Sequence, residues 1–341
     1  MGGKNFTAEI DAFMKRLEMI DVDGISMEPY CKRYLGHLLQ HTKYYLSIYA
    51  EVLEKLLAHS SNKKSEIVLI DYGCGNGLLG MFAKFCGFKK VFLNDIDETF
   101  IDAAKALSAQ LNLDMDGYLI GGVDQLCTQL KDERINAITG TDVIEHIYDL
   151  EKFFEAIHEM NPAMVSVFTT ASNPSNYFKV RQLKKLQLKD ELEGGSPNDS
   201  VLFGSEALEP FLTLRERIIR QRPANLNEPE ILALARATRG KSESDIIAAI
   251  ADYRTSGKMP QAAEGTNTCN PLNGSWTERI LSLDTYKSLY ANAGFTCRFY
   301  AGFYNDTGKG VGAFVKKLLN AAISTMGKKI SPYIVIVGFK K

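Results

Sequence analysis

The chain has 341 residues, of which 45% are hydrophobic and 24% are charged, a size and composition that suit one large domain with an insertion, or two domains. The formal net charge is −1, so no global basic field is available to recruit nucleic acid. The first residues contain no apolar signal core and no run of 18 apolar residues occurs, so neither secretion nor a membrane-spanning segment is expected.

Residues 1–64 are predicted to form an N-terminal helical segment. Pro29 opens a long stretch through Leu57 in which apolar residues recur at near-helical spacing. One face of this stretch carries aromatic and imidazole side chains, namely Tyr30, Tyr34, His37 and His41. Such a face either lines an acceptor site, with Tyr34 as the substrate contact, or is a half-buried packing surface.

Residues 65–174 alternate between strand and helix patterns. Short apolar runs bounded by turn residues predict strands at about 67–71, 91–95, 117–121, 135–140 and 164–169, with helices between them. This alternation is typical of an α/β, doubly wound, mostly parallel sheet.

The segment 67–80, Ile-Val-Leu-Ile-Asp-Tyr-Gly-Cys-Gly-Asn-Gly-Leu-Leu-Gly, says most about function. A buried strand runs into a glycine-dense turn, whose backbone can approach a ligand closely, and then into a helix with free N–H groups at its positive end. About 20 residues further on, a second strand ends in Asn94-Asp95-Ile96-Asp97, where a carboxylate can accept hydrogen bonds from ribose hydroxyls. Together the two segments predict a nucleotide-cofactor cradle.

Two classes of cofactor share that cradle, and the glycine spacing separates them. Dinucleotide folds prefer G-x-G-x-x-G, whereas this turn reads G-x-G-x-G after Asp71 and resembles the first motif of the class I S-adenosylmethionine-dependent methyltransferases. The resemblance continues through Asp142-Val-Ile-Glu145-His146-Ile147, the strand 164–170, the helix that ends at Gly294 and the closing strand 333–338, in all roughly two-thirds of the chain. It implies a seven-stranded Rossmann-like methyltransferase fold with S-adenosylmethionine as cofactor and S-adenosylhomocysteine as product.

The resemblance also implies a set of cofactor-binding residues: Asp71, Gly73, Cys74, Gly75, Asn76, Gly77, Asp95, Ile96, Val123 and Asp142. The three glycines would hold the backbone against the methionine part, and Asp71 would accept a hydrogen bond near the cofactor amino group. Asp95 is expected to bind the ribose hydroxyls, with Asp97 in reserve, while Ile96 would pack on the adenine. The family's common Gly-Asp after the third strand is replaced here by Gly-Gly-Val-Asp at 121–124, so the Val123 N–H would serve the adenine edge.

Catalytic residues are harder to assign from sequence. Methyl transfer from a sulfonium is an in-line displacement, and a proton must be removed only when the acceptor is a hydroxyl or a protonated amine. His146, with Glu145 beside it, suits a general base, although this histidine can equally cap or orient its loop. Asp142, Glu145 and His146 also have the i, i+3, i+4 spacing at which side chains converge on one helical turn. That spacing looks like the metal-binding element of divalent-metal-assisted methyltransferases in ubiquinone synthesis and small-RNA end modification. No fourth ligand is identifiable in the sequence. We therefore expect no metal, and metal-assisted methyl transfer is the alternative.

Residues 175–265 interrupt the alternation and are predicted to be a helical lid insertion, with helices at 206–219, 228–238 and 243–254. Ser242-x-x-Asp245 makes a capping box for the last of these helices. Because ligands bind beyond the carboxyl ends of the strands in open α/β sheets, a block after the fifth strand can cover the substrate; the alternative is a docking surface.

Residues 266–341 are predicted to complete the core sheet. A turn-rich stretch, 266–279, contains the substrate candidates Trp276, Glu278 and Arg279, with Arg279 also a catalytic candidate. The alternative is an Asn/Gly turn with the tryptophan packed in the core. Beyond this stretch the pattern predicts a helix from Ser282 to Gly294, a strand at 295–300, a helix at 312–326 and a strand at 333–339.

We therefore expect a cytoplasmic S-adenosylmethionine-dependent methyltransferase that acts on a small or medium-sized acceptor, with O-methylation favoured over N- or C-methylation. The six cysteines lack CxxC spacing and suit reduced thiols in the cytosol. RNA methylation is disfavoured because the one dense basic segment, 179–189, is short and mixed with apolar residues. An NAD-binding enzyme or a nucleotide-binding module on a similar sheet is the alternative outside this class. A small-molecule acceptor is the expected partner, with no membrane association and with homodimerisation left open.

Overall fold

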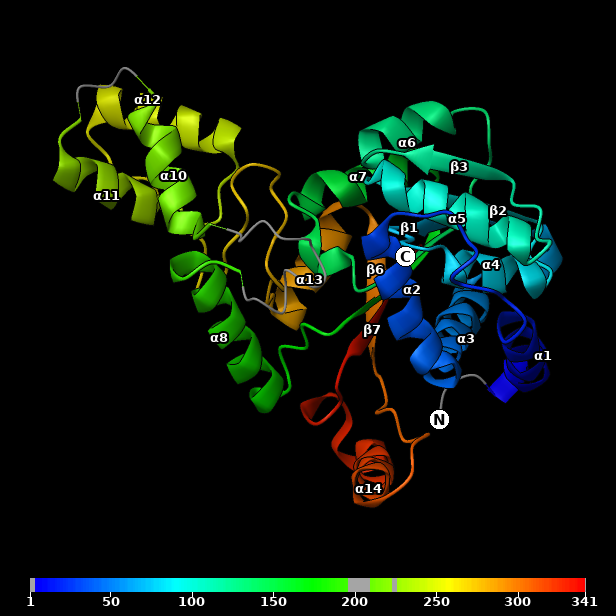
Figure 1. Cartoon of the computed structure of the whole chain (residues 1–341). Coiled ribbons are helices and arrows are strands. Elements are labelled where there is room, and N and C mark those ends of the chain that lie inside the picture. The colour runs from blue at the N-terminus through cyan, green and yellow to red at the C-terminus, as the bar shows by residue number, and fades with distance from the viewer. Residues whose placement is uncertain (1–3, 196–208, 223–225, 341) are drawn as a thin grey trace. The chain divides into compact units, whose positions relative to one another are not determined.

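The computed structural model describes residues 4–195, 209–222 and 226–340 (Figure 1). The chain divides into two compact units. Unit 1 comprises residues 1–144, 149–176 and 282–341, and unit 2 comprises residues 145–148 and 177–281. Unit 2 therefore reaches beyond the expected insertion, because it takes in the turn-rich stretch up to residue 281 and the short segment 145–148.

Unit 1 is built on a sheet that has seven strands within the described residues, in the order β3-β2-β1-β4-β5-β7-β6. The strands are β1 (Val68–Tyr72), β2 (Lys90–Asp95), β3 (Gly117–Ile120), β4 (Ala137–Thr141), β5 (Val165–Thr170), β6 (Phe295–Ala301) and β7 (Ile334–Lys340). Neighbouring strands are parallel except for β7, which runs antiparallel to β5 and β6. The prediction of an α/β, doubly wound, mostly parallel sheet is confirmed, and each predicted strand lies within two residues of its observed bounds.

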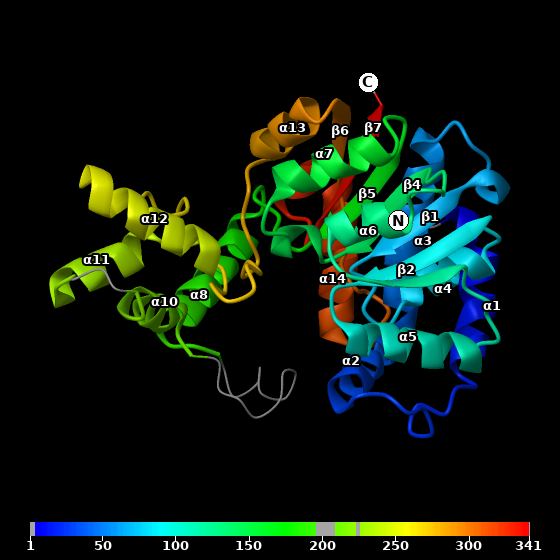
Figure 2. The ribbon, with the colours of Figure 1, turned by 90° about the horizontal axis from the view of Figure 1, so that it is seen from above.

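Helices cover both faces of this sheet (Figure 2). The helical segments of unit 1 are η1 (Lys4–Phe6), α1 (Thr7–Leu17), α2 (Pro29–Gln40), α3 (Thr42–His59), η2 (Lys64–Glu66), α4 (Leu78–Phe85), α5 (Glu98–Gln110), α6 (Val123–Gln129), α7 (Leu150–Met160), α13 (Leu283–Asn292), α14 (Val311–Met326) and η4 (Gly327–Lys329), while η3 (Ile144–His146) begins at the end of unit 1. Helices α1, α3 and α4 pack on one another, and α7 packs on α6 and α13. With both faces covered, the central strands are buried on both sides, and all six residues of β5 are buried.

The N-terminal helical stretch is not continuous, contrary to the sequence prediction. His41 has a non-helical backbone, with φ −128° and ψ 32°, and separates α2 from α3. The hydroxyl of Thr42, the first residue of α3, donates a hydrogen bond of 2.7 Å back to the carbonyl of Leu39. A local side-chain bond of this kind competes with helix continuation, and hydrophobic spacing alone does not reveal it.

In its described residues, unit 2 contains the helices α8 (Tyr177–Leu192), α10 (Phe211–Arg220), α11 (Glu228–Ala237) and α12 (Glu243–Ser256) and the non-helical stretch 257–281. The helices predicted at 228–238 and 243–254 are confirmed; of the helix predicted at 206–219, residues 206–208 lie outside the described part. Helices α10 to α12 bury a small apolar core, namely Ile218, Ile219, Ile231, Leu234, Ala235, Ile246 and Ile250.

The predicted capping box of α12 is only half formed. The Ser242 hydroxyl accepts the backbone N–H of Asp245 at 3.4 Å. The Asp245 carboxylate, however, accepts the hydroxyl of Tyr148, and the Ser242 N–H donates to that same hydroxyl oxygen at 2.9 Å. Tyr148 therefore replaces the reciprocal bond, and it joins the short segment 145–148 to unit 2.

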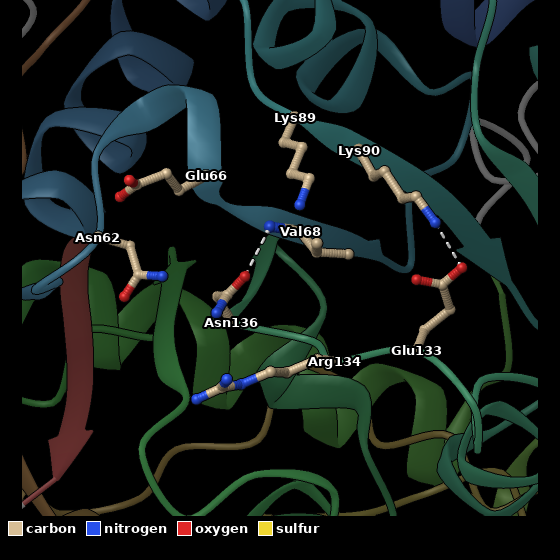
Figure 3. Close-up of a pocket in the computed structure, with 8 residues that line it drawn as sticks. All are labelled: Asn62, Glu66, Val68, Lys89, Lys90, Glu133, Arg134 and Asn136. Atoms are coloured by element: carbon tan, nitrogen blue, oxygen red, sulfur yellow. Dashed lines mark hydrogen bonds and ion pairs between the residues drawn. The ribbon is translucent and has the colours of Figure 1, made fainter.

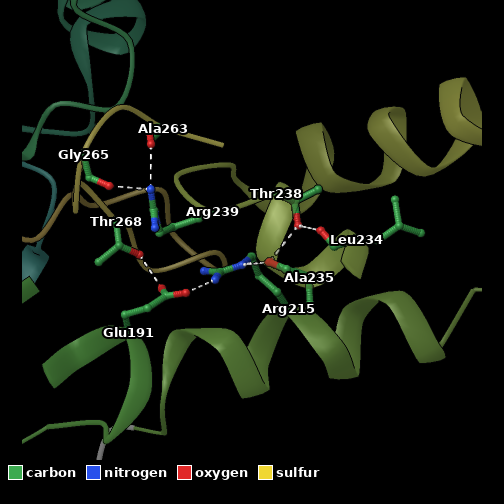
Figure 4. Close-up of polar contacts among 9 residues, drawn as sticks. All are labelled: Glu191, Arg215, Leu234, Ala235, Thr238, Arg239, Ala263, Gly265 and Thr268. Atoms are coloured by element: carbon green, nitrogen blue, oxygen red, sulfur yellow. Dashed lines mark hydrogen bonds and ion pairs between the residues drawn. The ribbon is translucent and has the colours of Figure 1, made fainter. Parts of the chain in front are cut away.

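A buried arginine ties α10 to the other elements of unit 2 (Figure 4). Arg215 is fully buried; its Nε donates to the carbonyl of Ala235 at 2.7 Å and its guanidinium pairs with Glu191. The second carboxylate oxygen of Glu191 accepts the Thr268 hydroxyl at 2.8 Å. Because a buried charge is costly unless it is paired, this network fixes α8, α10, α11 and the stretch after α12 together.

In the described part of the chain, no helix combines the length and the apolar character needed to cross a membrane.

Candidate functional site

The glycine turn between β1 and α4 lies at the carboxyl end of β1, where open α/β sheets bind ligands. Gly73, Gly75 and Gly77 all have left-handed backbones, with φ of 63°, 52° and 79°. A Cβ at Gly77 would lie 2.8 Å from a methyl of Leu93, so that glycine is required by packing. A Cβ at Gly75 would instead meet the ring of Tyr34 at 3.2 Å. Gly75 is thus the position at which the turn comes close to the N-terminal helix.

Asp95 anchors the glycine turn to the end of β2. Its two carboxylate oxygens accept the N–H of Gly75 at 2.9 Å and the N–H of Asp97 at 3.0 Å. Burial raises the pKa of Asp95, and these backbone hydrogen bonds oppose the rise. Each oxygen has a further lone pair, so the carboxylate can still accept a ligand hydroxyl.

Asp97 has a different task, because its side chain caps α5. One oxygen accepts the backbone N–H of Thr99 at 2.9 Å and the Thr99 hydroxyl at 2.8 Å. Between the two carboxylates, Ile96 is 77% exposed, so an apolar surface stands at the end of β2 where the sequence places the adenine. The geometry therefore favours Asp95 over Asp97 as the ribose carboxylate.

Asp71 holds the first turn of α4. It is buried, and its carboxylate accepts the N–H of Gly80 at 2.8 Å. Burial is the main cause that raises the pKa of Asp71 to about 7; the bond from Gly80 lowers it and the nearby Asp95 raises it further. The expected contact of Asp71 with the cofactor amino group stays a prediction, and its observed partner is the protein backbone.

This raised pKa makes stability depend on pH. Below its usual pKa, Asp71 is protonated in the folded and unfolded states alike; between that value and about 7 the folded state holds the extra proton. The contribution of Asp71 to stability is therefore largest at low pH and is lost as the pH rises through about 7. We expect Asp71→Asn, which keeps an acceptor for Gly80, to show a smaller fall in melting temperature than the wild type between pH 5 and pH 8 without ligand. Parallel pH profiles in differential scanning calorimetry would contradict this expectation.

The N-terminal helix α2 is tied directly to the glycine turn. The Asn76 side-chain amide, fully buried, donates to the carbonyl of Cys31 at 2.9 Å, and its Oδ1 meets no donor among the described residues. Tyr34 and Phe100 lie beside Gly75 with their rings in edge contact at 5.7 Å. Burial raises the pKa of Tyr34. Sequence reasoning named Tyr34 and Asn76 but missed Cys31 and Phe100, because apolar spacing does not show which helix faces the turn.

The turn after β3 is also fixed to β2. Gly121 donates its N–H to the carbonyl of Asp95 at 3.0 Å, and its carbonyl accepts the Asn94 amide at 3.0 Å. Val123, half-buried, is the first residue of α6, where a backbone N–H has no acceptor within its own helix. The expectation that this N–H serves the adenine edge in place of a carboxylate stays a prediction.

Cys74 and Asp142 complete the set of predicted cofactor residues. The Cys74 N–H donates to the Asn94 carbonyl at 2.9 Å, which joins the turn to β2, and burial raises the pKa of its thiol. Asp142 has a left-handed backbone with φ 51°, and its carboxylate accepts the N–H of Ala171 at 3.2 Å. Asp142 therefore holds the end of β4 to the end of β5.

Of the predicted catalytic and substrate residues, Tyr34 lies in unit 1, and five others share unit 2: Glu145, His146, Trp276, Glu278 and Arg279. The N–H groups of Trp276 and Arg279 donate to the carbonyls of His146 and Glu145, each at 3.4 Å. The sequence did not show that these two segments pair, because their bonds connect residues more than a hundred positions apart.

Trp276 packs inside unit 2. It is 5% exposed, its indole N–H donates to the Tyr148 carbonyl at 3.1 Å, and the Arg279 guanidinium lies 4.1 Å from its ring centre. A Cβ at Gly240 would meet the indole at 2.8 Å. The role of Trp276 in this structure is therefore to support the Arg279 guanidinium, and a direct substrate contact by its ring stays a prediction. Glu278 has a left-handed backbone with φ 43°.

His146 has a defined tautomer. Its Nδ1 lies 2.7 Å from the carbonyl oxygen of Trp276. A carbonyl only accepts, so Nδ1 carries the proton and, in the neutral ring, Nε2 carries the lone pair. His146 is thereby oriented with Nε2 able to take a proton.

The helical turn that the metal-assisted alternative requires is not observed. Glu145 and His146 belong to the short helix η3, whereas the left-handed backbone of Asp142 lies before it. Among the residues that the structure describes, no group of three or more His, Cys, Asp or Glu side chains could hold a metal ion.

A hollow of about 340 Å³ lies at the opposite ends of the strands (Figure 3). Its lining includes Val68 and Lys90, the first residues of β1 and β2. Asn136 accepts the N–H of Val68 at 2.9 Å there, and Lys90 pairs with Glu133 at 2.6 Å. Because it lies at the amino ends of β1 and β2, the hollow is distinct from the cofactor turn at their carboxyl ends.

Comparison with known proteins finds a family model that matches part of the chain. Residues 40–199 match the family described as a methyltransferase domain. The match spans 160 of the 341 residues, so the chain contains a segment that is similar to methyltransferase domains. The residues present fit the cofactor of this family, because Asp95, Gly75 and the turn at 121–123 border one edge of the sheet and the buried Asn76 Oδ1 offers a further acceptor.

Individual relatives of this chain are distant. The chain is 33% identical to an uncharacterised protein of Methanocaldococcus jannaschii over 128 residues, 38% of this chain and 52% of the relative. It is 35% identical to ribosomal protein L11 methyltransferase of Acinetobacter baumannii over 71 residues, 21% of this chain and 23% of that protein. It is 24% identical to ubiquinone biosynthesis O-methyltransferase of Rickettsia bellii over 120 residues, 35% and 48% of the two chains. The chain thus matches about half or less of the length of each of these relatives.

Among solved structures, an S-adenosylmethionine-dependent methyltransferase from Mesorhizobium loti is 11% identical, with a TM-score of 0.43 over 85% of this chain and 95% of that one.

Proposed function

We propose that this protein transfers a methyl group from S-adenosylmethionine to a small or medium-sized acceptor, at a hydroxyl group. The main support for S-adenosylmethionine as the methyl donor is the Asp95 carboxylate, which is buried at the end of β2 and hydrogen-bonded to the N–H of Gly75. That bond brings the carboxylate that we propose to bind the ribose next to the glycine turn, whose spacing resembles the methyltransferase motif.

The cofactor supplies an activated methyl group on a sulfonium, and the chain supplies binding and orientation. The remaining lone pairs of Asp95 accept the ribose hydroxyls, the exposed side chain of Ile96 packs on the adenine, and the Val123 N–H donates to its edge. The turn at Gly75 lets the backbone approach the methionine part without a side chain in between. In-line transfer then depends on holding the acceptor atom in line with the methyl group and the sulfur.

Acceptor binding is assigned to the paired segments of unit 2. His146, with its Nδ1–H held by the Trp276 carbonyl, takes the proton of the acceptor hydroxyl on Nε2. Arg279, stacked on Trp276, presents a guanidinium that orients a polar acceptor. The order of the chain supports this assignment, because segments 145–148 and 177–281 follow directly after β4 and after the β5 region.

We favour oxygen over nitrogen or carbon as the acceptor atom because His146 is oriented to remove a proton. A neutral amine or an activated carbon needs no general base in the methyl transfer itself. The similarity to an enzyme named ubiquinone biosynthesis O-methyltransferase is compatible with it. A cytosolic location is proposed on the six free cysteines.

Replacement of the ribose carboxylate tests the proposal. We expect Asp95→Ala to weaken S-adenosylhomocysteine binding by about 1–3 kcal/mol in isothermal titration calorimetry, the scale for loss of a charge-assisted hydrogen bond. Asp97→Ala is the matched control, because it removes a carboxylate from the α5 cap and should lower stability without comparable loss of affinity. Unchanged affinity in Asp95→Ala would remove this residue from the site. Thermal stabilisation of the wild type by NAD but not by S-adenosylhomocysteine would overturn the proposed function itself.

A further inference from the structure

Helix α14 presents apolar side chains to solvent. None of its residues is buried. The most exposed large apolar side chains of this helix are between 45% and 80% accessible: Val311, Phe314, Val315, Leu318 and Met326. Isolated apolar residues on a surface are ordinary, but a contiguous group on one helix marks an interaction site.

The apolar side of α14 faces outward because the helix is attached through a polar residue. The Asn320 amide donates to the Tyr304 carbonyl at 3.0 Å and to Asp306 at 3.1 Å, and its oxygen accepts the Tyr304 N–H at 2.7 Å. Val311, Val315 and Leu318 follow the i, i+4, i+7 spacing of a single stripe, and Asn320 lies on the other side of the helix. Figure 1 shows α14 beyond the ends of β6 and β7, and its main packing partner is the adjoining η4. An ordinary surface helix turns its apolar stripe toward the core, whereas α14 turns its apolar stripe toward solvent.

The charged side chains of α14 and of the chain that follows it are all basic, and the nearest carboxylate, Asp306, is bonded to Asn320 on the side opposite the apolar stripe. Five lysines lie within or beside the helix: Lys309, Lys316, Lys317, Lys328 and Lys329. No aspartate or glutamate occurs from residue 307 to the last residue, 341. A helix with an apolar stripe and only lysines among its charged residues has the composition of a helix that lies in the headgroup region of a membrane, where anionic lipids attract the charges.

We propose that α14 is an interfacial helix that binds this protein to anionic phospholipid surfaces. The stripe defined by Val311, Phe314, Val315 and Leu318 enters the boundary between headgroups and acyl chains, while Lys316 and Lys317 extend to the phosphates. This inference replaces the sequence expectation of no membrane association. It does not depend on methyl transfer, because it uses no residue of the cofactor turn.

Vesicle co-sedimentation of the full chain tests the proposal. We expect binding to vesicles of phosphatidylcholine with phosphatidylglycerol, weaker binding to phosphatidylcholine alone, and release by salt. Phe314→Ser with Leu318→Ser should reduce binding at least about tenfold through loss of apolar burial. Lys316→Glu with Lys317→Glu should reduce it at least about tenfold on anionic vesicles only, since each lysine near such a surface contributes roughly fivefold.

The matched control also replaces a lysine by glutamate and an exposed apolar residue by serine, but near the end of a different helix. Lys15→Glu with Met19→Ser alters an exposed lysine and a methionine that is 78% exposed near the end of α1, and it should leave vesicle binding unchanged. Melting temperatures show that each variant is folded. The proposal is overturned if the wild type does not bind anionic vesicles or if the Phe314 and Leu318 variant binds as well as the wild type. It is also overturned if the wild type is a lipid-independent dimer that this variant converts to a monomer.

Discussion

Gly75→Val is expected to abolish S-adenosylhomocysteine binding, with a loss of at least about a hundredfold in affinity. The residue has φ 52°, and a β-branched side chain in that region costs about 1–3 kcal/mol. The new Cβ would also lie 3.2 Å from the Tyr34 ring, and its methyl groups would occupy the space where the backbone is proposed to meet the cofactor. Calorimetric titration with S-adenosylhomocysteine measures the effect.

Gly87→Val provides the matched control for backbone strain. Gly87 has φ 87°, and a Cβ added there would meet no atom within 4 Å, so the same substitution costs stability without touching the glycine turn. We expect this variant to melt at a lower temperature and still bind S-adenosylhomocysteine. Equal loss of affinity in both variants would show that strain, and not the cradle, explains the effect at Gly75.

His146→Asn is expected to lower the rate of methyl transfer to a hydroxyl acceptor by about 10²–10⁴-fold, the usual contribution of a general base. The asparagine amide can still donate to the Trp276 carbonyl that Nδ1–H now contacts at 2.7 Å, so the paired segments should stay in place. Release of S-adenosylhomocysteine in the presence of a hydroxyl acceptor measures the rate, and calorimetry should show unchanged cofactor affinity.

His59→Asn is the control for this substitution, because its Nδ1 also lies near a carbonyl oxygen, that of Lys55 at 2.9 Å, at the end of α3. Its turnover should match the wild type. If His146→Asn keeps full turnover and loses only thermal stability, His146 is a structural link between the two segments of unit 2.

The local spacing of apolar and turn residues was enough to predict the sheet and most helices of this chain. The strands were predicted within two residues because both faces are covered and each strand is a short apolar run between turn residues. The cofactor turn could be predicted because its chemistry is carried by contiguous residues, Asp71 to Gly77, and one strand end at Asp95.

The features that the sequence did not reveal depend on contacts between residues far apart along the chain. The segment 145–148 belongs to unit 2 because Trp276 and Arg279 donate to its carbonyls and Tyr148 contacts Ser242. The Asp245 carboxylate leaves the expected capping box for the same reason. Likewise, the bond from Asn76 to the Cys31 carbonyl joins two segments that no periodicity connects. Each of these contacts competes with a local preference and prevails only in the folded chain.

The position of β7 between β5 and β6 has a consequence for synthesis on the ribosome. Strand β5 ends at Thr170, and its antiparallel neighbour begins only at Ile334. At ordinary elongation rates, roughly ten to thirty seconds separate the emergence of the two strands. During that interval the backbone of Val167 and Phe168 has no neighbour on one side, so the nascent sheet presents an open apolar edge to other chains. Residues 177–281 of unit 2 are made in that interval and lengthen the time for which this aggregation-prone state lasts. The yield of folded protein should therefore depend on chaperones that cover the edge of β5.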